Sequence, residues 1–548
     1  MLRSNLRAAF VVLALAATPA AAAPMIPVAG DPVAIDTGKV AGTQVDSAVK
    51  AYLGIPFAAP PIRENRWRAP QPVKPWSGVL NADTARAECY QGLRAPSINH
   101  YFGDENAAED CLYLNIWAPV GAKAGDKLPV VVWIYGGAFN VGSASSPIYS
   151  GAPLASKGVI YIAANYRLGL FGFLAHPELT AESGHNASGN WGFLDQVEAL
   201  KWVQRNVAAF GGDPANVTLV GQSAGSMSIN NLQASPLAKG LFHRVYGMSG
   251  ATVEGGAGGG VPLAQAEAQG VKLQQAVKAA SIADLRGYAP DRLTALAQQA
   301  QVRAGPAIDG WYLPRSTSEI FATGQQSDVP VVTGWTANDI GTEVPIRGAT
   351  TLVEYQAAAK AMYGDKAEAL LKAYPAKTDA EARRQAQAVG TDSGFGVGAR
   401  ACVRAQSATG KQPAYLFLVS RVQPFTPGVK YTDFDQARAG AYHMGDVPYF
   451  LGTYEAFNLF RTTRDWTAYD RELSNRMQDT IVAFAKTGSP STAAVRWPAW
   501  TAKTEPLVVF GDDVTVGRIN TAGADFLAST PRLPPPPTPT DARPRQTF

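Results

Sequence analysis

The chain has 548 residues, of which 46% are hydrophobic and only 17% are charged. This composition supplies a large apolar core and excludes a disordered chain, which combines low hydrophobicity with high net charge. Lys and Arg total 48 and Asp and Glu total 44, so the formal net charge is +4. That charge is too small for the basic surface that nucleic-acid-binding proteins use, so we expect no nucleic-acid partner.

Residues 1–22 are typical of a signal peptide. Arg3 and Arg7 precede an apolar run at 8–17, and small residues follow this run. We expect cleavage before Ala23. This run is too short to cross a bilayer, and no later apolar stretch has the length of about 18 residues that a span requires. The sequence therefore predicts a secreted or periplasmic protein without a membrane span.

Export would place the three cysteines in an oxidising compartment. Cys89 and Cys111 are 22 positions apart and Cys402 is distant. The simplest assignment is one disulfide, Cys89–Cys111, with Cys402 left as a thiol. Three cysteines without nearby histidine pairs do not make a zinc site, and we expect no metal or cofactor.

Strand-like and helical patterns alternate along the chain. Continuous apolar strands are expected at 129–135, 159–163, 217–220, 245–248, 329–333 and 415–419. Apolar residues recur every three or four positions over 193–207, which predicts a helix. This alternation favours an α/β fold with a parallel sheet buried on both faces. We expect one large domain over 23–530, with a surface loop at 254–260 and a Pro-rich tail at 531–548.

Residues 221–225 read Gly-Gln-Ser-Ala-Gly and follow the strand expected at 217–220. A G-x-S-x-G sequence between a strand and a helix forms a sharp turn that exposes the serine hydroxyl at the edge of the sheet. The N-terminus of the following helix favours developing negative charge. Ser223 is therefore the predicted nucleophile.

A serine hydroxyl needs a base, and with this motif the acid and then the histidine follow the serine along the chain. Three of the five histidines precede Ser223: His100, His176 and His185. His243 follows it by only 20 positions, too early for an acid on a separate strand to lie between them. Elimination leaves His443 as the predicted base.

The orienting acid is expected on a loop that follows a strand between Ser223 and His443. Asp339 and Glu343 both follow the strand expected at 329–333. Asp339 is preferred and Glu343 is the alternative; either would orient the imidazole and stabilise its charged form.

The tetrahedral intermediate of acyl transfer needs hydrogen-bond donors for its oxyanion. The amide of Ala224, directly after the nucleophile, is one such donor. The glycine-rich loop at 135–139, which follows an expected strand, is the second source.

These residues lie in longer patterns that resemble the type B carboxylesterase family of α/β-hydrolases, which includes cholinesterases and para-nitrobenzyl esterases. Residues 210–225 resemble the family's nucleophile signature, and 109–119 resemble its second signature. Further landmarks lie at 52–61, 165–169 and 189–196. The resemblance extends over roughly residues 30–525.

The resemblance implies an α/β-hydrolase fold with a large central, mostly parallel mixed sheet flanked by helices. It implies oxyanion donors from Gly137, Ala138 and Ala224, and a Cys89–Cys111 disulfide near the mouth of a gorge. The family's acid is usually a glutamate in Asp-Glu-Gly, whereas this chain has Asn-Asp-Ile at 338–340, which places a shorter acid there.

The function implied is an exported serine esterase that hydrolyses small-molecule carboxylic esters through an acyl-enzyme. Some exported bacterial members resemble fumonisin esterases that remove tricarballylate side chains, which extends the expected substrates to esters with polyanionic side chains. One alternative is a non-catalytic cholinesterase-like binding protein, because some relatives use this fold for adhesion. Another is a hydrolase of amide, carbamate or thioester bonds.

Overall fold

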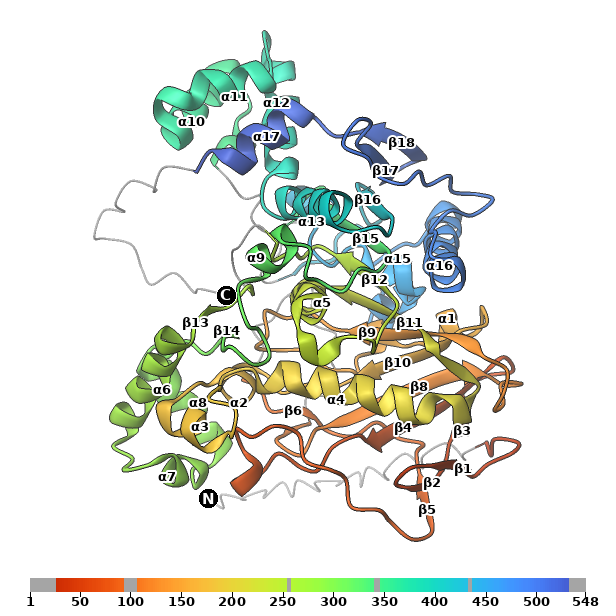
Figure 1. Ribbon diagram of the computed structural model, residues 1–548. Helices are drawn as coiled ribbons and strands as arrows, with labels where there is room; N and C mark the ends of the chain where they lie inside the picture. Colours follow the sequence, from red (N-terminus) through yellow and green to blue (C-terminus); the bar gives the residue numbers. More distant parts are fainter. Residues whose placement is uncertain (1–25, 93–105, 254–257, 340–344, 432–435, 532–548) are drawn as a thin grey trace, which may run out of the picture.

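The computed structural model describes residues 26–92, 106–253, 258–339, 345–431 and 436–531 (Figure 1). The predicted signal peptide, nearly all of the predicted tail, most of the predicted loop at 254–260, and Glu343 lie outside these residues.

Eleven strands form one sheet, in the order β18-β17-β16-β15-β12-β11-β9-β10-β8-β4-β3. Seven neighbouring strands are parallel: β17 (Pro506–Phe510), β16 (Ala414–Val419), β15 (Val331–Thr336), β12 (Arg244–Met248), β11 (Gly212–Gln222), β9 (Leu128–Ile134) and β10 (Ile160–Ala164). Antiparallel strands complete both edges: β18 (Val514–Arg518), β8 (Tyr113–Pro119), β4 (Val49–Pro56) and β3 (Thr43–Gln44). The prediction of a large, mixed and mostly parallel sheet is confirmed.

All six strands expected from apolar runs belong to the parallel part of this sheet. Their side chains are buried on both faces; β9, for example, is buried throughout after Leu128. Helices cover both faces, which explains why these strands lack polar alternation. The helix expected at 193–207 is α4 (Trp191–Asn206), followed by a short 3-10 turn.

Helices α4, α5 (Ala224–Ala234) and α13 (Phe395–Thr409) pack along one face of the sheet, and α16 (Ala468–Thr487) packs against the other (Figure 1). Shorter helices join these layers: α1 (Ala152–Ala155), α2 (Gly169–Phe173), α3 (Pro177–Glu182), α9 (Thr317–Ala322), α14 (Gln436–Ala439) and α15 (Val447–Leu451). A group at one end contains α6 (Leu263–Val277), α7 (Ile282–Arg286) and α8 (Pro290–Gln299). Small sheets are formed by β1 (Val33–Ile35), β2 (Gly38–Ala41) and β5 (Val79–Asn81), by β6 (Glu88–Cys89) and β7 (Ala107–Ala108), and by β13 (Val261–Pro262) and β14 (Ala307–Ile308).

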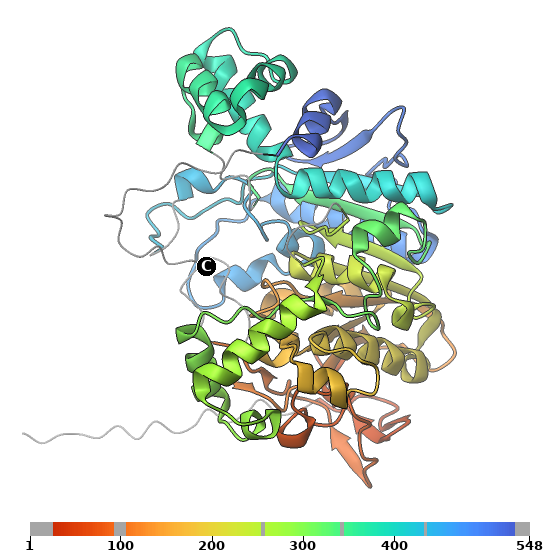
Figure 2. The same ribbon diagram turned by 60° about the vertical axis from the view of Figure 1, so that its left-hand side comes forward.

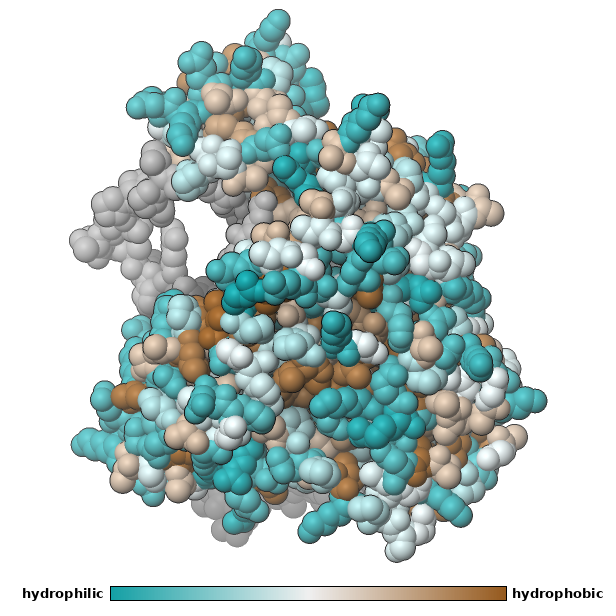
Figure 3. Space-filling view, in the orientation of Figure 1, coloured by the Kyte–Doolittle hydropathy of each residue, from teal (hydrophilic) through white to brown (hydrophobic). Residues whose placement is uncertain are grey.

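In the described residues the buried apolar side chains form one extensive core around the large sheet and two smaller clusters. The larger of these two belongs mainly to four helices: α10 (Leu352–Tyr363), α11 (Ala367–Ala373), α12 (Asp379–Asp392) and α17 (Thr521–Ser529). Figure 2 shows these helices standing beyond one end of the sheet. Hydrophilic side chains project around their rim (Figure 3), while their apolar side chains face inward.

The predicted Cys89–Cys111 disulfide is present, with an S–S distance of 2.04 Å and both cysteines buried. It ties β6 to the segment that enters β8. Cys402 is buried on α13, and its Sγ lies 3.6 Å from Oδ1 of Asn230.

Candidate active site

Ser223 is the single residue between the end of β11 and the start of α5. Its backbone has φ 57° and ψ −125°, a conformation that residues with a Cβ rarely adopt. Glycines on both sides permit it, because a Cβ on Gly221 or Gly225 would lie 2.8 or 2.0 Å from the carbonyl oxygen of Ile134. The strained turn is thus built into the junction of strand and helix, as the G-x-S-x-G motif predicts.

The loop after β9 packs directly against this turn. A Cβ on Gly136 would lie 2.8 Å from Cβ of Ser223. Gly137 and Ala138 have φ values of 114° and 54°. The carbonyl oxygen of Gly137 accepts a hydrogen bond from Asn140 N at 2.9 Å, and that of Ala138 accepts one from Asn140 Nδ2 at 2.8 Å.

The amides of Gly137 and Ala138 remain available to a ligand. In the part of the chain that the structure describes, those of Gly137 and Ala138 donate to no backbone or side-chain acceptor. Ala224 is the first residue of α5, where amides have no partner within the helix. Three amides predicted to bind an oxyanion therefore lie on the two loops that meet at Ser223.

Asp339 and His443 form a short hydrogen bond, with 2.5 Å between Oδ1 and Nδ1. Asp339 is 1% exposed, and its Oδ2 accepts a hydrogen bond from Thr336 N at 3.1 Å. Burial acts to raise the pKa of Asp339, but the charge and hydrogen bond of His443, with the Ser249 hydroxyl and the Thr336 amide, outweigh it. The net pKa is lowered, so this carboxyl group is a carboxylate at neutral pH.

Asn338 sets the register between the acid and the histidine. Its amide donates to the carbonyl oxygen of Ala441 at 2.8 Å, and its Oδ1 accepts from Ala441 N at 3.0 Å. Asn338 and Tyr442 form a parallel bridge, so the next residue on each segment, Asp339 and His443, face each other.

The other described histidines have structural contacts away from Ser223. Nδ1 of His176 accepts from Glu178 N at the start of α3, and Nδ1 of His243 accepts from Val217 N, both at 3.1 Å. The ring of His185 stacks on Trp311 at 3.7 Å between centroids. His100 lies outside the described residues.

Two neighbours of His443 were not predicted from the sequence. Nε2 of Gln222 lies 3.1 Å from Nε2 of His443, and the ring of Phe395 stacks on the imidazole at 5.6 Å. Within the described residues no direct hydrogen bond joins Ser223 to His443, because the side-chain amide of Gln222 contacts Nε2 of His443 instead. Hydrogen bonds of catalytic groups often tighten only when substrate binds.

A cavity of about 290 Å³ borders the loop that contains Gly137 and Ala138. Asn140 and Val141 line it next to that loop, and Leu168, Phe171 and Tyr90 supply apolar surface. Among the described residues its lining contains no charged side chain; Gln91, Thr294 and Gln298 are polar but neutral.

A model of the carboxylesterase family matches residues 30–525 of the chain. The fumonisin B1 esterase of Sphingopyxis macrogoltabida is 34% identical over 492 residues, 88% of this chain and 86% of that protein. The para-nitrobenzyl esterase of Bacillus subtilis (strain 168) is also 34% identical, over 87% of this chain and 94% of that protein. A solved structure of PNB esterase aligns with a TM-score of 0.73 at 32% identity, covering 90% of this chain and 99% of that one.

The chain belongs to the carboxylesterase family. It is therefore a carboxylic ester hydrolase of the type B carboxylesterases, with the α/β-hydrolase architecture expected from the sequence. No helix in the described ranges is long and apolar enough to cross a membrane. The same ranges contain no cluster of three His, Cys, Asp or Glu side chains arranged to hold a metal ion.

A second buried acid, Asp446, lies three residues after His443 in this carboxylesterase. It is fully buried at the start of α15. Burial raises its pKa from an ordinary 3.8 to about 7; the charge of Asp339 adds to the rise and His443 opposes it. The folded protein holds the Asp446 proton more tightly than the unfolded chain does. The protonated carboxyl group therefore contributes its full share to the free energy of unfolding below pH 3.8, and this contribution is lost as pH rises through about 7.

Asp446→Asn removes this ionisation, so we expect the variant to gain stability relative to the wild type as pH rises. The difference in melting temperature should be about 2 °C more favourable to the variant at pH 8 than at pH 5. Thermal unfolding in buffers of equal ionic strength measures it. Asp365→Asn, at a fully exposed carboxylate, is the control and should show no such difference. An unchanged difference for Asp446→Asn would contradict the prediction.

Proposed function

We propose that this carboxylesterase is an exported serine hydrolase of small-molecule esters in which Ser223, His443 and Asp339 form the catalytic triad. The observation that carries the proposal is the buried Asp339–His443 hydrogen bond of 2.5 Å, beside a serine held in a strained turn. The proposal also rests on the order of the three residues along the chain, which is that of α/β-hydrolase triads.

Each residue has a defined role in the proposed reaction. Ser223 Oγ attacks the ester carbonyl while Nε2 of His443 takes the hydroxyl proton, and the alcohol leaves with that proton. Water then attacks the acyl-enzyme, again with His443 as base, and releases the acid. Asp339 holds Nδ1 and stabilises the imidazolium; the amides of Gly137, Ala138 and Ala224 bind the oxyanion.

We propose neutral esters as the principal substrates. The cavity beside the oxyanion loop has a lining of apolar and neutral polar side chains among the described residues, and such a surface supplies no counter-charge for a carboxylate. The similarity to a fumonisin B1 esterase favours a second candidate, an ester with a polyanionic side chain.

A substrate panel tests both candidates. Purified protein is incubated with p-nitrophenyl butyrate, with an amide and a thioester of butyrate, and with an ester of tricarballylate. We expect kcat/KM to be highest for the neutral ester. A higher value for the tricarballylate ester would instead support the second candidate, and turnover of the amide alone would overturn the esterase assignment for this site. Labelling of Ser223 by a fluorophosphonate, located by peptide mass spectrometry, tests the nucleophile; absence of labelling would revive the non-catalytic alternative.

The export proposal rests on the sequence of residues 1–22. When the full chain is expressed in a bacterium, we expect activity in the periplasmic fraction or the medium and a mature N-terminus at Ala23. Cytoplasmic activity with an intact N-terminus would contradict it.

A further inference from the structure

We infer that Arg464 and Gln423 act as a clamp on the loop that carries His443 and so position this histidine; this inference rests on the proposed role of His443 as base. Neither residue belongs to a motif of the sequence, and neither is needed to explain the fold of the sheet. The inference comes from where their hydrogen bonds end.

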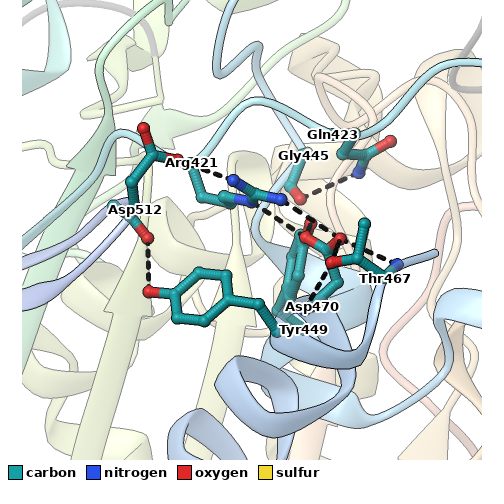
Figure 4. A network of polar contacts seen from close by, with 9 residues as sticks. Arg421, Gln423, Gly445, Tyr449, Thr467, Asp470 and Asp512 are labelled. Carbon is teal, nitrogen blue, oxygen red and sulfur yellow. Dashed lines mark hydrogen bonds and ion pairs between the residues drawn. The ribbon is translucent and has the colours of Figure 1, made fainter.

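Gln423 reaches the histidine loop on both sides of His443. Its Nε2 donates to the carbonyl oxygen of Gly445 at 3.0 Å (Figure 4), and its Oε1 accepts from the hydroxyl of Tyr442 at 2.8 Å. Tyr442 directly precedes His443 and Gly445 follows it by two residues. One side chain therefore holds the side chain of the residue before the imidazole and the backbone two residues after it.

Arg464 fixes Gln423 and Tyr442 in turn. Its Nε donates to Oε1 of Gln423 at 2.7 Å, and its Nη2 donates to the hydroxyl of Tyr442 at 3.3 Å. Nη1 donates to the hydroxyl of Tyr431 at 2.7 Å and to the carbonyl oxygen of Thr463 at 3.1 Å. A planar guanidinium with donors in fixed directions suits this set of acceptors, which a lysine cannot satisfy together.

Burial of the Arg464 guanidinium lowers the stability of the fold, which is unexpected for a residue with only a structural role. It is 1% exposed, and in the described ranges its hydrogen-bond acceptors are all neutral oxygens. The rings of Phe425 and Phe457 lie 4.1 and 5.0 Å from its guanidinium carbon. A buried cation held only by neutral acceptors and aromatic faces is less stable than an ion pair or an apolar side chain of similar size.

Tyr442 connects Gln423 and Arg464 to His443, which directly follows it in the chain. Burial raises the pKa of its phenol, and Arg464 only partly opposes this, so the hydroxyl keeps its proton and donates it to Gln423. On the other side of the loop, Asn338 bonds Ala441 and places Asp339 at Nδ1. The histidine loop thus has two anchors, one at the acid and one at Gln423 and Arg464.

A further layer supports the segment that contains Gln423. Arg421, two residues earlier, donates from Nε to Asp470 at 2.8 Å, and Asp470 also accepts from the hydroxyl of Tyr449 on α15 at 2.8 Å (Figure 4). The segment after β16 is therefore held against α15 and α16, which gives the clamp a rigid base.

The test is a double-mutant cycle with Arg464→Met and Tyr442→Phe on p-nitrophenyl butyrate. Displacing a catalytic group by about 1 Å costs on the order of 100-fold in rate, so we expect Arg464→Met to lower kcat by about 10- to 100-fold with KM changed by less than about threefold. Because both residues act on one loop, the double variant should be little worse than Arg464→Met alone. Arg464→Lys should not restore kcat, whereas Gln423→Glu, which keeps the acceptor oxygen, should retain more activity than Gln423→Ala.

The control is Arg400→Met, at another buried arginine, which pairs with Glu505 and Asp525 far from the histidine loop in sequence. It should lower the melting temperature and leave kcat within about threefold. The rate of Ser223 labelling by a fluorophosphonate is the second readout, and it should fall in Arg464→Met in proportion to kcat. Additive effects in the cycle, or unchanged kcat in a folded Arg464→Met, would overturn the inference. If Ser223 is not the nucleophile, the wild type will show no labelling of Ser223, a result distinct from either.

Discussion

Ser223→Ala should reduce kcat for p-nitrophenyl butyrate by at least about 10⁴-fold, with little change in the melting temperature. The alanine leaves the strained turn and the oxyanion amides in place, but removes the atom that forms the acyl-enzyme. Residual hydrolysis is expected, because the amides that bind the oxyanion still accelerate attack by water on the bound ester. The measurement compares steady-state rates of purified wild type and variant, together with loss of the burst that acyl-enzyme formation produces.

Ser235→Ala is a matched control, since Ser235 ends the same helix and its hydroxyl donates to the carbonyl oxygen of Tyr312 at 2.6 Å. Loss of one buried hydrogen bond costs about 1 kcal/mol of stability and should leave kcat within a factor of about three. Retention of more than a tenth of the wild-type rate by Ser223→Ala would refute an acyl-enzyme at this serine. A comparable loss in Ser235→Ala would show that a disturbance of α5, and not loss of the Ser223 hydroxyl, lowers the rate.

Six of the seven parallel strands were predicted, because burial on both faces leaves a continuous apolar run. β9 and β10 are such runs, since α helices cover both faces of the sheet there. The edge strand β18 was missed for the complementary reason, because it is largely exposed and its residues carry no such run. β4, β8 and β17 were missed although their residues are largely buried.

The predicted site residues were accessible from the sequence for different reasons. Ser223 was predicted because the backbone of its turn demands glycines on both sides. His443 was predicted because the chain has only five histidines, of which three precede Ser223 and a fourth follows it too closely. The structure brings His443 to Asp339 through the bridge at Asn338, a contact across more than one hundred residues.

Other neighbours of the histidine had no usable sequence signal. Arg464 follows the exposed residue Phe460 in a polar stretch, and nothing local distinguishes it from a surface arginine. Its burial depends on Phe425 and on Gln423, about forty residues earlier, and therefore on tertiary packing. Asp446 likewise has no signal in the neighbouring sequence that predicts its burial, and this burial raises its pKa.

Asp339 and Glu343 both fit the sequence pattern of the orienting acid, and a second large effect is expected at Asp339. Asp339→Asn should lower kcat by about 10³- to 10⁴-fold. An asparagine removes the negative charge that stabilises the imidazolium. If its amide nitrogen faces Nδ1, it also forces the proton onto Nε2, where His443 cannot accept the proton of Ser223. Binding of substrate does not require the carboxylate, so KM should change by less than about threefold.

Glu343→Gln is the decisive comparison, because Glu343 is only four positions away in the sequence, outside the described residues. Oδ1 of Asp339 already lies 2.5 Å from Nδ1 of His443, and Oδ2 of Asp339 is held by Thr336. The Nδ1–H group is therefore already used and is not left to donate to a second acid. We therefore expect Glu343→Gln to retain kcat within about threefold and Asp339→Asn to lose it. The reverse pattern, measured on folded variants with matched melting temperatures, would assign the acid to Glu343. It would also mean that the short hydrogen bond at Asp339 orients the ring without contributing to the rate.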